Sequence, residues 1–298
     1  MAALRAVGLL AEEWWYGFVA DSTDGKGRGP VSDAIDVMLG TVLDCLQAAE
    51  TVPVRRAAAE ALFHLLGHSR EALSSADPAS RGTHIVRAAI SLCRTNLTND
   101  GPEHPEVAAV GLRCIGRFVS EHFAIIGPHL SSVCPVVLAA VRWVPQLVAV
   151  QALEFWTSLA NHEISNQVYD DGAVREAATL LVPALLELLA QTNGCVEFDE
   201  GPDGTLMEAA SACLACVLLA AGHLAVEQCL SLAAPYLTSS DHRLRRVSII
   251  AIGCAAELSC PASEAAIVAS FGALLSALDV PELRRAAAVC LGRIFEFQ

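Results

Sequence analysis

The feature of this sequence that most constrains its fold is an internal repeat. Three segments share an aliphatic residue, two arginines and a run of small residues, and they begin at Val54, Leu244 and Leu283. Looser copies begin at Val107, Val148 and Met207. The six copies follow one another at intervals of 53, 41, 59, 37 and 39 residues, and the two long intervals contain an extended connector at 69–82 and a polar insertion at 192–205. A period of roughly 40–47 residues is typical of arrays of helical pairs.

Each repeat has the pattern of two helices. Leu283, Ala287, Cys290 and Ile294 are spaced by 4, 3 and 4 residues, which places them on one face of a helix. A partner helix precedes each copy, and these partners are expected at 32–48, 83–96, 130–144, 174–191, 224–238 and 262–277. One such pair cannot bury its apolar face alone, so neighbouring pairs must stack. The sequence predicts an all-α fold, an α-solenoid (superhelix) of HEAT/armadillo-like helical-pair repeats.

The domain organisation that follows is a single HEAT-repeat array over residues 1–298. It begins with a single helix and a glycine-rich connector at 1–29. Helical pairs are expected at 30–70, 83–122, 130–162, 174–222, 224–258 and 262–298, with a polar, acidic loop at 192–205. Neither end resembles a polar capping repeat. We therefore expect a piece of a longer array, or a short form that needs a partner.

Composition narrows the classes of partner. The net charge is −14, which argues against binding a phosphate backbone and favours basic partners, so no nucleic acid partner is expected. Hydrophobic residues make up 54% of the chain and charged residues 17%, enough for a large core. The 11 cysteines are an odd number, and most lie in apolar helical stretches, where a free cysteine behaves as a small hydrophobe. This pattern indicates a reducing compartment.

One segment has a length near that of a membrane span. Residues 209–226 contain no charged side chain. However, many of them are alanine, and the step from Gly222 to His223 falls where the repeat needs a turn. No membrane insertion is expected.

The candidate enzymatic and metal-binding motifs of the sequence are incomplete. Cys213 and Cys216 have the spacing of a redox or metal motif, but no second Cys/His pair accompanies them, and core packing explains them better. His64 and His68 lack the remainder of a zinc-protease motif, and the glycine-rich loop at 25–29 follows no predicted strand. We expect no catalytic residue, no metal site and no cofactor, and hence a protein that is not an enzyme.

Three stretches carry a resemblance to a known family. The segment 148–156, which ends in Glu154, Phe155 and Trp156, resembles the importin β signature around the seventh HEAT repeat. Residues 241–246 with 251–254 resemble the ninth repeat, and 283–285 with 291–294 resemble the tenth. Their order and spacing agree, and the insertion at 192–205 falls where that family carries its acidic loop. The resemblance covers a partial chain, from the second helix of the fourth repeat to the tenth.

The resemblance implies a nuclear transport receptor that works in protein import into the nucleus. It implies binding of basic cargo peptides, or of the importin-β-binding segment of importin α, on the concave face formed by second helices. The matching positions there are Glu154, Trp156, Glu163, Glu257 and Glu296. The acidic loop corresponds to Glu197, Asp199, Glu200 and Asp203. The alternative interpretation of each carboxylate is a solvated helix end.

The resemblance also implies binding of Phe-Gly nucleoporins on the convex face, between the first helices of the fifth to seventh repeats. The matching positions are Leu39, Leu43, His84 and Ile85, and the alternative for these is ordinary interhelix core. RanGTP is a further partner of the family, but its main contacts lie on the first three repeats, outside the matched range, so we expect a weakened Ran contact. The implied location is cytoplasmic and nuclear, including the nuclear envelope and pore.

A second class of function stays open. Another HEAT-repeat scaffold, such as a different karyopherin or a phosphatase-type scaffold, would share the repeat but not the cargo. Salt-sensitive binding of a basic importin-β-binding peptide, together with binding of Phe-Gly peptides, distinguishes the transport receptor from such a scaffold.

Overall fold

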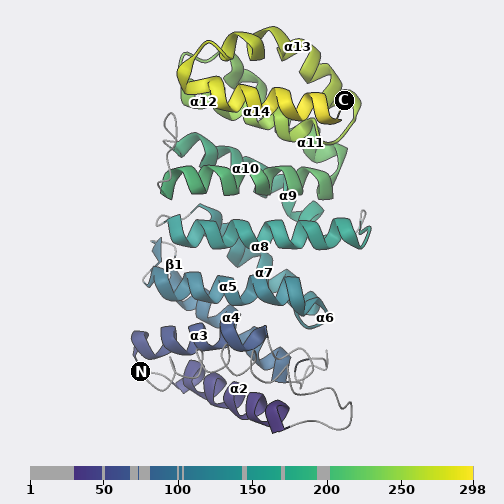
Figure 1. The fold of residues 1–298 in the computed structure, drawn as a ribbon. Coiled ribbons are helices and arrows are strands. Elements are labelled where there is room, and N and C mark those ends of the chain that lie inside the picture. The colour runs from purple at the N-terminus through teal and green to yellow at the C-terminus, as the bar shows by residue number, and fades with distance from the viewer. Residues whose placement is uncertain are drawn as a thin grey trace. The chain divides into compact units, whose positions relative to one another are not determined.

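The computed structural model describes residues 30–48, 51–67, 73, 81–98, 101–102, 104–142, 146–168, 172–192 and 202–297. These residues are almost entirely helical (Figure 1). The exceptions in regular structure are two short strands, β1 (Leu97–Thr98) and β2 (Gly101–Pro102), which pair antiparallel between two helices. The expected single helix and connector at 1–29 lie outside the described residues.

The chain divides into two compact units, residues 1–151 and residues 152–298. In the first unit, the first helices of the pairs are α2 (Pro30–Ala48), α4 (Arg81–Asn96) and α7 (Leu130–Val141), the last preceded by α6 (Phe123–Ile126) and the 3-10 turn η1 (Gly127–His129). The second helices are α3 (Val52–Leu66), α5 (Pro105–Glu121) and the start of α8 (Gln146–Ser165). Within this unit, α3 packs on α5, while α2 and α7 contact α4, so the helices form two layers.

The second unit repeats this arrangement. Its first helices are α9 (Ala173–Gln191), α11 (His223–Ala233) with the 3-10 turn η2 (Ala234–Thr238), and α13 (Pro261–Ala277). Its second helices are the remainder of α8, then α10 (Pro202–Ala221), α12 (His242–Ala255) and α14 (Pro281–Phe297). Helix α11 contacts both α9 and α13, and α12 contacts both α10 and α14. Each unit is therefore a stack of helical pairs.

Local sequence explains where these helices begin and end. One proline occupies the first or second position of each of the helices α3, α5 and α13, where its missing N–H costs no helical hydrogen bond. Asp241 caps α12 by accepting the backbone N–H of Arg243 at 2.8 Å. Gly222 separates α10 from α11 with a φ of 81°, a conformation that favours glycine. The predicted turn at Gly222-His223 is thus present, and residues 209–226 are not one continuous helix.

Two predicted helices differ from the structure. The helix expected at 224–238 changes to a 3-10 turn at Ala234, next to Pro235, which cannot donate an α-helical hydrogen bond. The helix expected at 130–144 corresponds to α7, which ends at Val141, while residues 143–145 lie outside the described residues. The structure also adds α6 and η1, which the sequence analysis did not predict.

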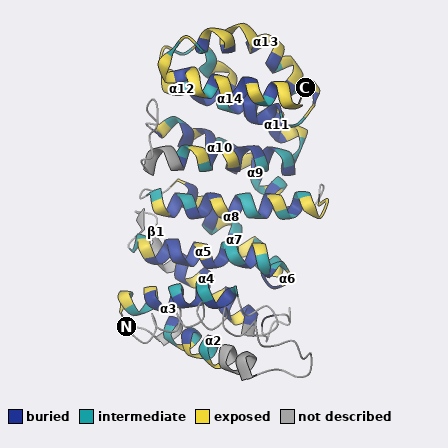
Figure 2. Ribbon diagram, viewed as in Figure 1, coloured by how far each residue is buried: buried dark blue, intermediate teal, exposed yellow. Residues whose placement is uncertain are grey.

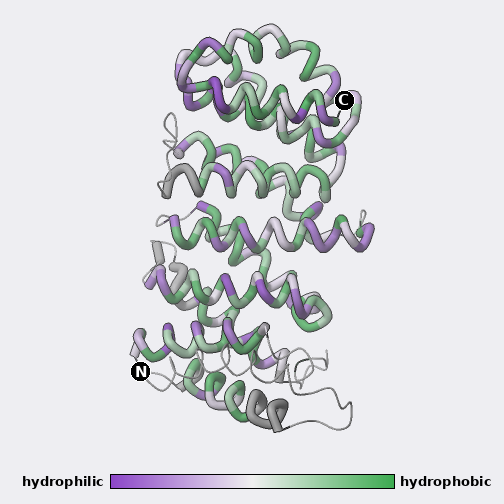
Figure 3. The backbone as a smooth tube through the Cα atoms, viewed as in Figure 1, coloured by the Kyte–Doolittle hydropathy of each residue, from purple (hydrophilic) through white to green (hydrophobic). Residues whose placement is uncertain are grey.

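The core lies between the helices of each unit (Figure 2). Its largest fully buried side chains include Trp156, Phe118 and Phe155, and leucine, valine and alanine fill most of the rest. Apolar segments run through nearly every helix (Figure 3). This distribution is what a stack of pairs requires, because an internal pair buries both of its sides.

One stretch of the described residues, Phe123–Val141, is long and apolar enough to cross a membrane by length and composition alone. It consists of α6, η1 and α7, with a third of it buried inside the protein. The core helices of soluble proteins pass the same test, so this is weak support for a span.

Candidate functional site

The predicted nucleoporin-binding positions in the first unit do not form an exposed groove. The side chains of Leu39 on α2 and Ile85 on α4 are both fully buried. Leu43 is half-buried and His84 is exposed. Leu39 and Ile85 therefore belong to the core, and the prediction that they line a surface groove is corrected. The sequence pattern alone could not separate the two interpretations, because both need aliphatic residues on one helix face.

Large apolar side chains are exposed instead on the first helices of the second unit. Leu180 on α9 and Leu224 and Leu232 on α11 are 61%, 56% and 41% exposed, and we call these three residues the leucine patch. Leu224, Gln228 and Leu232 follow one another at intervals of four residues, so they lie along one side of α11. The Gln228 side-chain amide donates to the backbone carbonyl of Thr179, with an Nε2–O distance of 3.0 Å.

This hydrogen bond connects the two helices that carry the patch. Thr179 precedes Leu180, so the bond joins α11, at the residue midway between Leu224 and Leu232, to the α9 residue next to Leu180. Exposed leucines on two adjacent helices offer a shallow apolar surface to a ring-sized ligand. Sequence analysis missed these residues because α9 is apolar on most of its sides, so no stripe stands out from the pattern.

The predicted basic-ligand positions on second helices fall into two groups. Trp156 is fully buried and Glu163 is 3% exposed, whereas Glu154 and Glu296 are exposed. Glu163 accepts the backbone N–H of Val174 at 3.2 and 3.3 Å from its two carboxylate oxygens, so it caps the start of α9. The prediction that Trp156 and Glu163 form part of an exposed ligand surface is therefore corrected.

Two of the predicted carboxylates, Glu257 and Glu296, lie near the same arginine, Arg293. Glu257, in the turn after α12, forms a salt bridge with Arg293 of α14, with a nitrogen–oxygen distance of 3.2 Å. Burial raises the pKa of the Glu257 carboxyl, Arg293 opposes this shift, and the charge of Glu296 adds to it. Glu257 and Glu296 thus lie close enough to interact electrostatically. We call these two residues the carboxylate pair, and Arg293 neutralises it only in part.

The predicted acidic loop is described only at its edges. Glu197, Asp199 and Glu200 lie outside the described residues, and Asp203 belongs to the first turn of α10, whose backbone alone is described there. The loop predicted at 192–205 is therefore shorter, because α10 begins at Pro202. At the start of the loop, the buried Arg246 donates from Nη2 to the carbonyl oxygen of Thr192, at 2.6 Å.

Catalytic or metal chemistry finds no support in the described part of the chain. No group of three or more His, Cys, Asp or Glu side chains there is placed to hold a metal ion. Cys213 is fully buried, and burial raises the pKa of its thiol to about 12. A thiol of this kind is a poor nucleophile, because the thiolate is scarce at neutral pH.

Comparison with known structures shows the fold class. The fold is a HEAT/armadillo-like α-solenoid: a designed armadillo repeat protein matches 86% of the chain, with a TM-score of 0.51 and 16% identity. An importin β structure from an ammonium sulfate condition matches with a TM-score of 0.80 and 18% identity, covering 99% of this chain and 34% of its own. A Kap95:Nup1 complex gives a TM-score of 0.80 at 19% identity, covering 99% of this chain and 33% of its own. The predicted fold class is confirmed.

Sequence comparison then gives the particular relatives. Importin subunit beta-1 of Arabidopsis thaliana is 27% identical over 280 residues, which cover 88% of this chain. Importin subunit beta-1 of Saccharomyces cerevisiae is 21% identical over 261 residues, which cover 84%. The predicted resemblance to importin β is confirmed over most of the chain. No family model matches the sequence. The chain spans 31% and 28% of the lengths of these two relatives.

Proposed function

We propose that this protein is a karyopherin-like nuclear transport receptor that acts by binding and not by catalysis. The observation that carries the proposal is the match to two importin β subunits over more than four fifths of the chain. The fold supports it, because a stack of helical pairs offers long surfaces on its first and its second helices. The protein would work in the cytoplasm and the nucleus and pass through the nuclear pore.

We assign the leucine patch to Phe-Gly nucleoporins. The three leucines lie on first helices, as the resemblance implies for nucleoporin binding, but on the two pairs that follow the fifth to seventh repeats. They are the kind of apolar surface that a phenylalanine ring needs. A solved relative, Kap95, is in complex with Nup1. The patch replaces the buried Leu39 and Ile85 as the candidate contact.

We assign the carboxylate pair to a basic ligand, either a cargo peptide or the importin-β-binding segment of importin α. Glu296 is exposed and Glu257 is half-buried, so an arriving lysine or arginine would meet one accessible carboxylate and one that is partly desolvated. Ion pairs that are partly shielded from water are stronger than exposed ones. The net charge of −14 would speed the approach of a basic peptide.

Ran is the weakest of the proposed partners. Another Kap95 structure concerns the effect of Kap95p on the switch loops of RanGDP. The resemblance implies that the main Ran contacts lie on the first three repeats of the family, so this chain would bind Ran less tightly than a protein containing them.

The experiment that tests this function is a titration with a labelled basic importin-β-binding peptide at about 50 mM and about 300 mM salt. We expect binding that weakens steeply with salt and is reduced by Glu296→Lys and by Glu257→Lys. Glu227→Lys on α11 is the matched control, because it makes the same charge change at an exposed position of a first helix. Equal weakening by the control would mean a general charge effect and would favour the alternative, a HEAT-repeat scaffold of another complex.

A further inference from the structure

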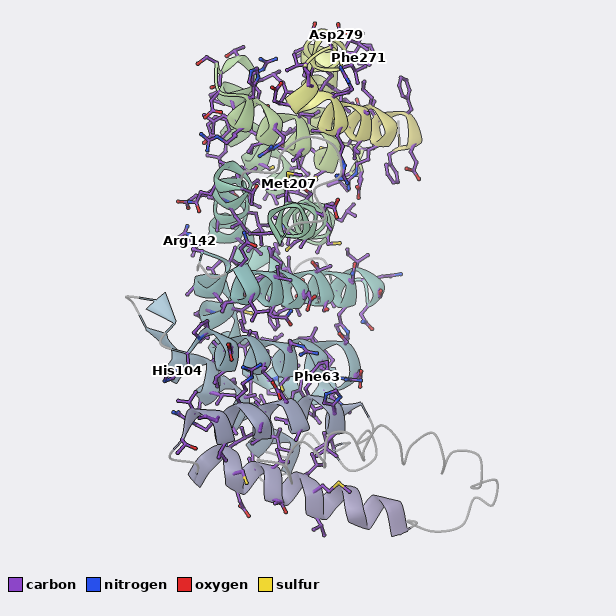
Figure 4. The ribbon with its side chains drawn as sticks, turned by 60° about the vertical axis from the view of Figure 1, so that its left-hand side comes forward. Phe63, His104, Arg142, Met207, Phe271 and Asp279 are labelled. Carbon is purple, nitrogen blue, oxygen red and sulfur yellow. The ribbon has the colours of Figure 1, made fainter. Side chains whose placement is uncertain are left out.

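The first unit carries an arginine–aromatic cluster that the proposed function does not use. It lies on the second helices, where two arginines of α5 approach the ring of Phe63 on α3. Figure 4 labels Phe63. The guanidinium carbon of Arg113 is 4.0 Å from the centre of the Phe63 ring, and that of Arg117 is 4.8 Å from it. Both distances lie within the range of a cation–π contact.

The two arginines have different surroundings. Arg117 donates to the Phe63 carbonyl oxygen at 3.2 Å and to Glu121 at 2.8 Å, so it is tied to both helices and paired with a carboxylate. A Cβ at Gly67 would overlap the Arg117 guanidinium, so the glycine makes room for it. Arg117 is thus a structural link between α3 and α5.

Arg113 is exposed, and in the part of unit 1 that the structure describes it has no carboxylate partner. By contrast, Arg56, an exposed arginine of α3, forms salt bridges with both Glu60 of α3 and Glu106 of α5. Arg113 and Arg117 are four residues apart, so their like charges repel across one turn of α5. One carboxylate, Glu121, offsets these two charges, which leaves a local excess of positive charge in a strongly acidic protein.

We propose that Arg113 is a binding site for a carboxylate of an acidic peptide segment. The Phe63 ring contacts the Arg113 guanidinium and restricts its position, while the guanidinium N–H groups can donate to a carboxylate through two parallel hydrogen bonds. Holding the fork in place before the ligand arrives reduces the entropy lost on binding. The carboxylate also relieves the repulsion between Arg113 and Arg117. This surface is separate from the carboxylate pair, and its ligand has the opposite charge.

The test is a fluorescence anisotropy titration of the full chain with a labelled peptide that alternates glutamate and glycine, at about 50 mM salt. We expect saturable binding that Arg113→Ala weakens by about tenfold, as loss of a charge-assisted bidentate contact implies. Arg113→Lys keeps the charge but loses the planar guanidinium, so its affinity for the peptide should lie between those of the unchanged protein and Arg113→Ala. Phe63→Leu keeps an apolar side chain but removes the cation–π contact, and it should also weaken binding.

The matched control is Arg94→Ala, which removes an equal charge at an exposed position of α4 in the same unit. It should bind the peptide as the unchanged protein does. The proposal is overturned if Arg113→Ala binds the peptide normally, or if Arg94→Ala weakens binding equally. Because Arg113 is exposed, the melting temperature of Arg113→Ala should stay unchanged, which separates loss of the site from loss of the fold.

Discussion

Gly253 of α12 lies directly against the backbone of Cys290 in α14. A Cβ placed on Gly253 would be 3.1 Å from the Cα of Cys290 and 3.3 Å from its Cβ. The same repeat position in the next copy, 39 residues further along, is Gly292, where an added Cβ would meet nothing within 4 Å. Close packing of α12 on α14 therefore requires glycine at position 253, whereas position 292 has room for a side chain.

This difference predicts opposite effects of substitution. Gly253→Val should destabilise the protein by about 1–3 kcal/mol, because the larger side chain forces α12 and α14 apart. Gly292→Ala should stabilise it by up to about 1 kcal/mol, because alanine is the better helix former and the site is open. Urea unfolding of both variants measures these changes. Equal effects at the two positions would contradict the stacking of α14 on α12.

The buried carboxylate of Glu163 gives a second prediction. Glu163→Ala leaves the Val174 N–H without its acceptor and should cost about 1–3 kcal/mol of stability, whereas Glu163→Gln retains an acceptor and should cost less. Gly172 allows this approach, since a Cβ there would be 2.5 Å from the Glu163 carboxylate. Chemical unfolding at pH 7 compares the two variants, and an alanine variant as stable as the unchanged protein would contradict the cap.

The same residue predicts a pH dependence. Burial raises the pKa of the Glu163 carboxyl in the folded state above its ordinary value of 4.5, with the nearby charge of Glu176 adding to the shift and hydrogen bonds from Ala173 and Val174 opposing it. The folded protein therefore binds the proton more readily than the unfolded chain. Its free energy of unfolding should rise, relative to that of Glu163→Gln, as the pH falls from 7 toward 4.5. A difference that shrinks on acidification would contradict this.

The salt bridge between Arg293 and Glu257 predicts a gain of binding. Arg293→Ala removes the cation that partly neutralises the carboxylate pair, so a basic peptide should bind this variant more tightly, by about threefold. The gain should disappear at high salt. Titration of the variant beside the unchanged protein measures it. Weaker binding, in a variant with an unchanged circular dichroism spectrum, would mean that the ligand does not use these carboxylates.

The cysteines predict a pattern of chemical reactivity. Burial raises the thiol pKa of Cys114, Cys213 and Cys290 to about 12 and that of Cys254 to about 11. Ellman's reagent should therefore react quickly with the half-exposed Cys45 and Cys134, and with the buried thiols only after addition of urea. Cys216 is also half-exposed, but burial raises its thiol pKa, so it should react more slowly than those two. A single fast phase without urea would show that the core is open to solvent.

Much of the fold could be predicted from the sequence because repetition reinforces a weak signal. The starts of α3, α5, α8, α12 and α14 each lie two residues before the corresponding repeat position. Helix periodicity cannot show the 3-10 turns η1 and η2, since they depend on where Pro128 and Pro235 interrupt the hydrogen-bond ladder. The two-residue strands β1 and β2 are too short to have a periodic pattern.

The candidate sites could be predicted much less well. Leu39 and Leu180 are both leucines on apolar helices, yet the first is fully buried and the second is 61% exposed. In a stack, neighbours cover a helix on several sides, so the local pattern does not reveal which apolar residue stays outside. Glu163 shows the same limit for charge: a carboxylate near a helix end is usually solvated, but here it caps the next helix.

The assignment of the leucine patch to nucleoporins is tested by the binding of a Phe-Gly repeat peptide to the unchanged protein and to Leu180→Asp and Leu232→Asp. Val37→Asp on α2 is the matched control, because Val37 is also exposed on a first helix, at 69%, but belongs to the other unit. We expect saturable binding that both leucine variants weaken by about tenfold or more and that the control leaves unchanged. Absence of binding to the unchanged protein, or equal binding by all four proteins, would contradict the assignment of the leucine patch to nucleoporins.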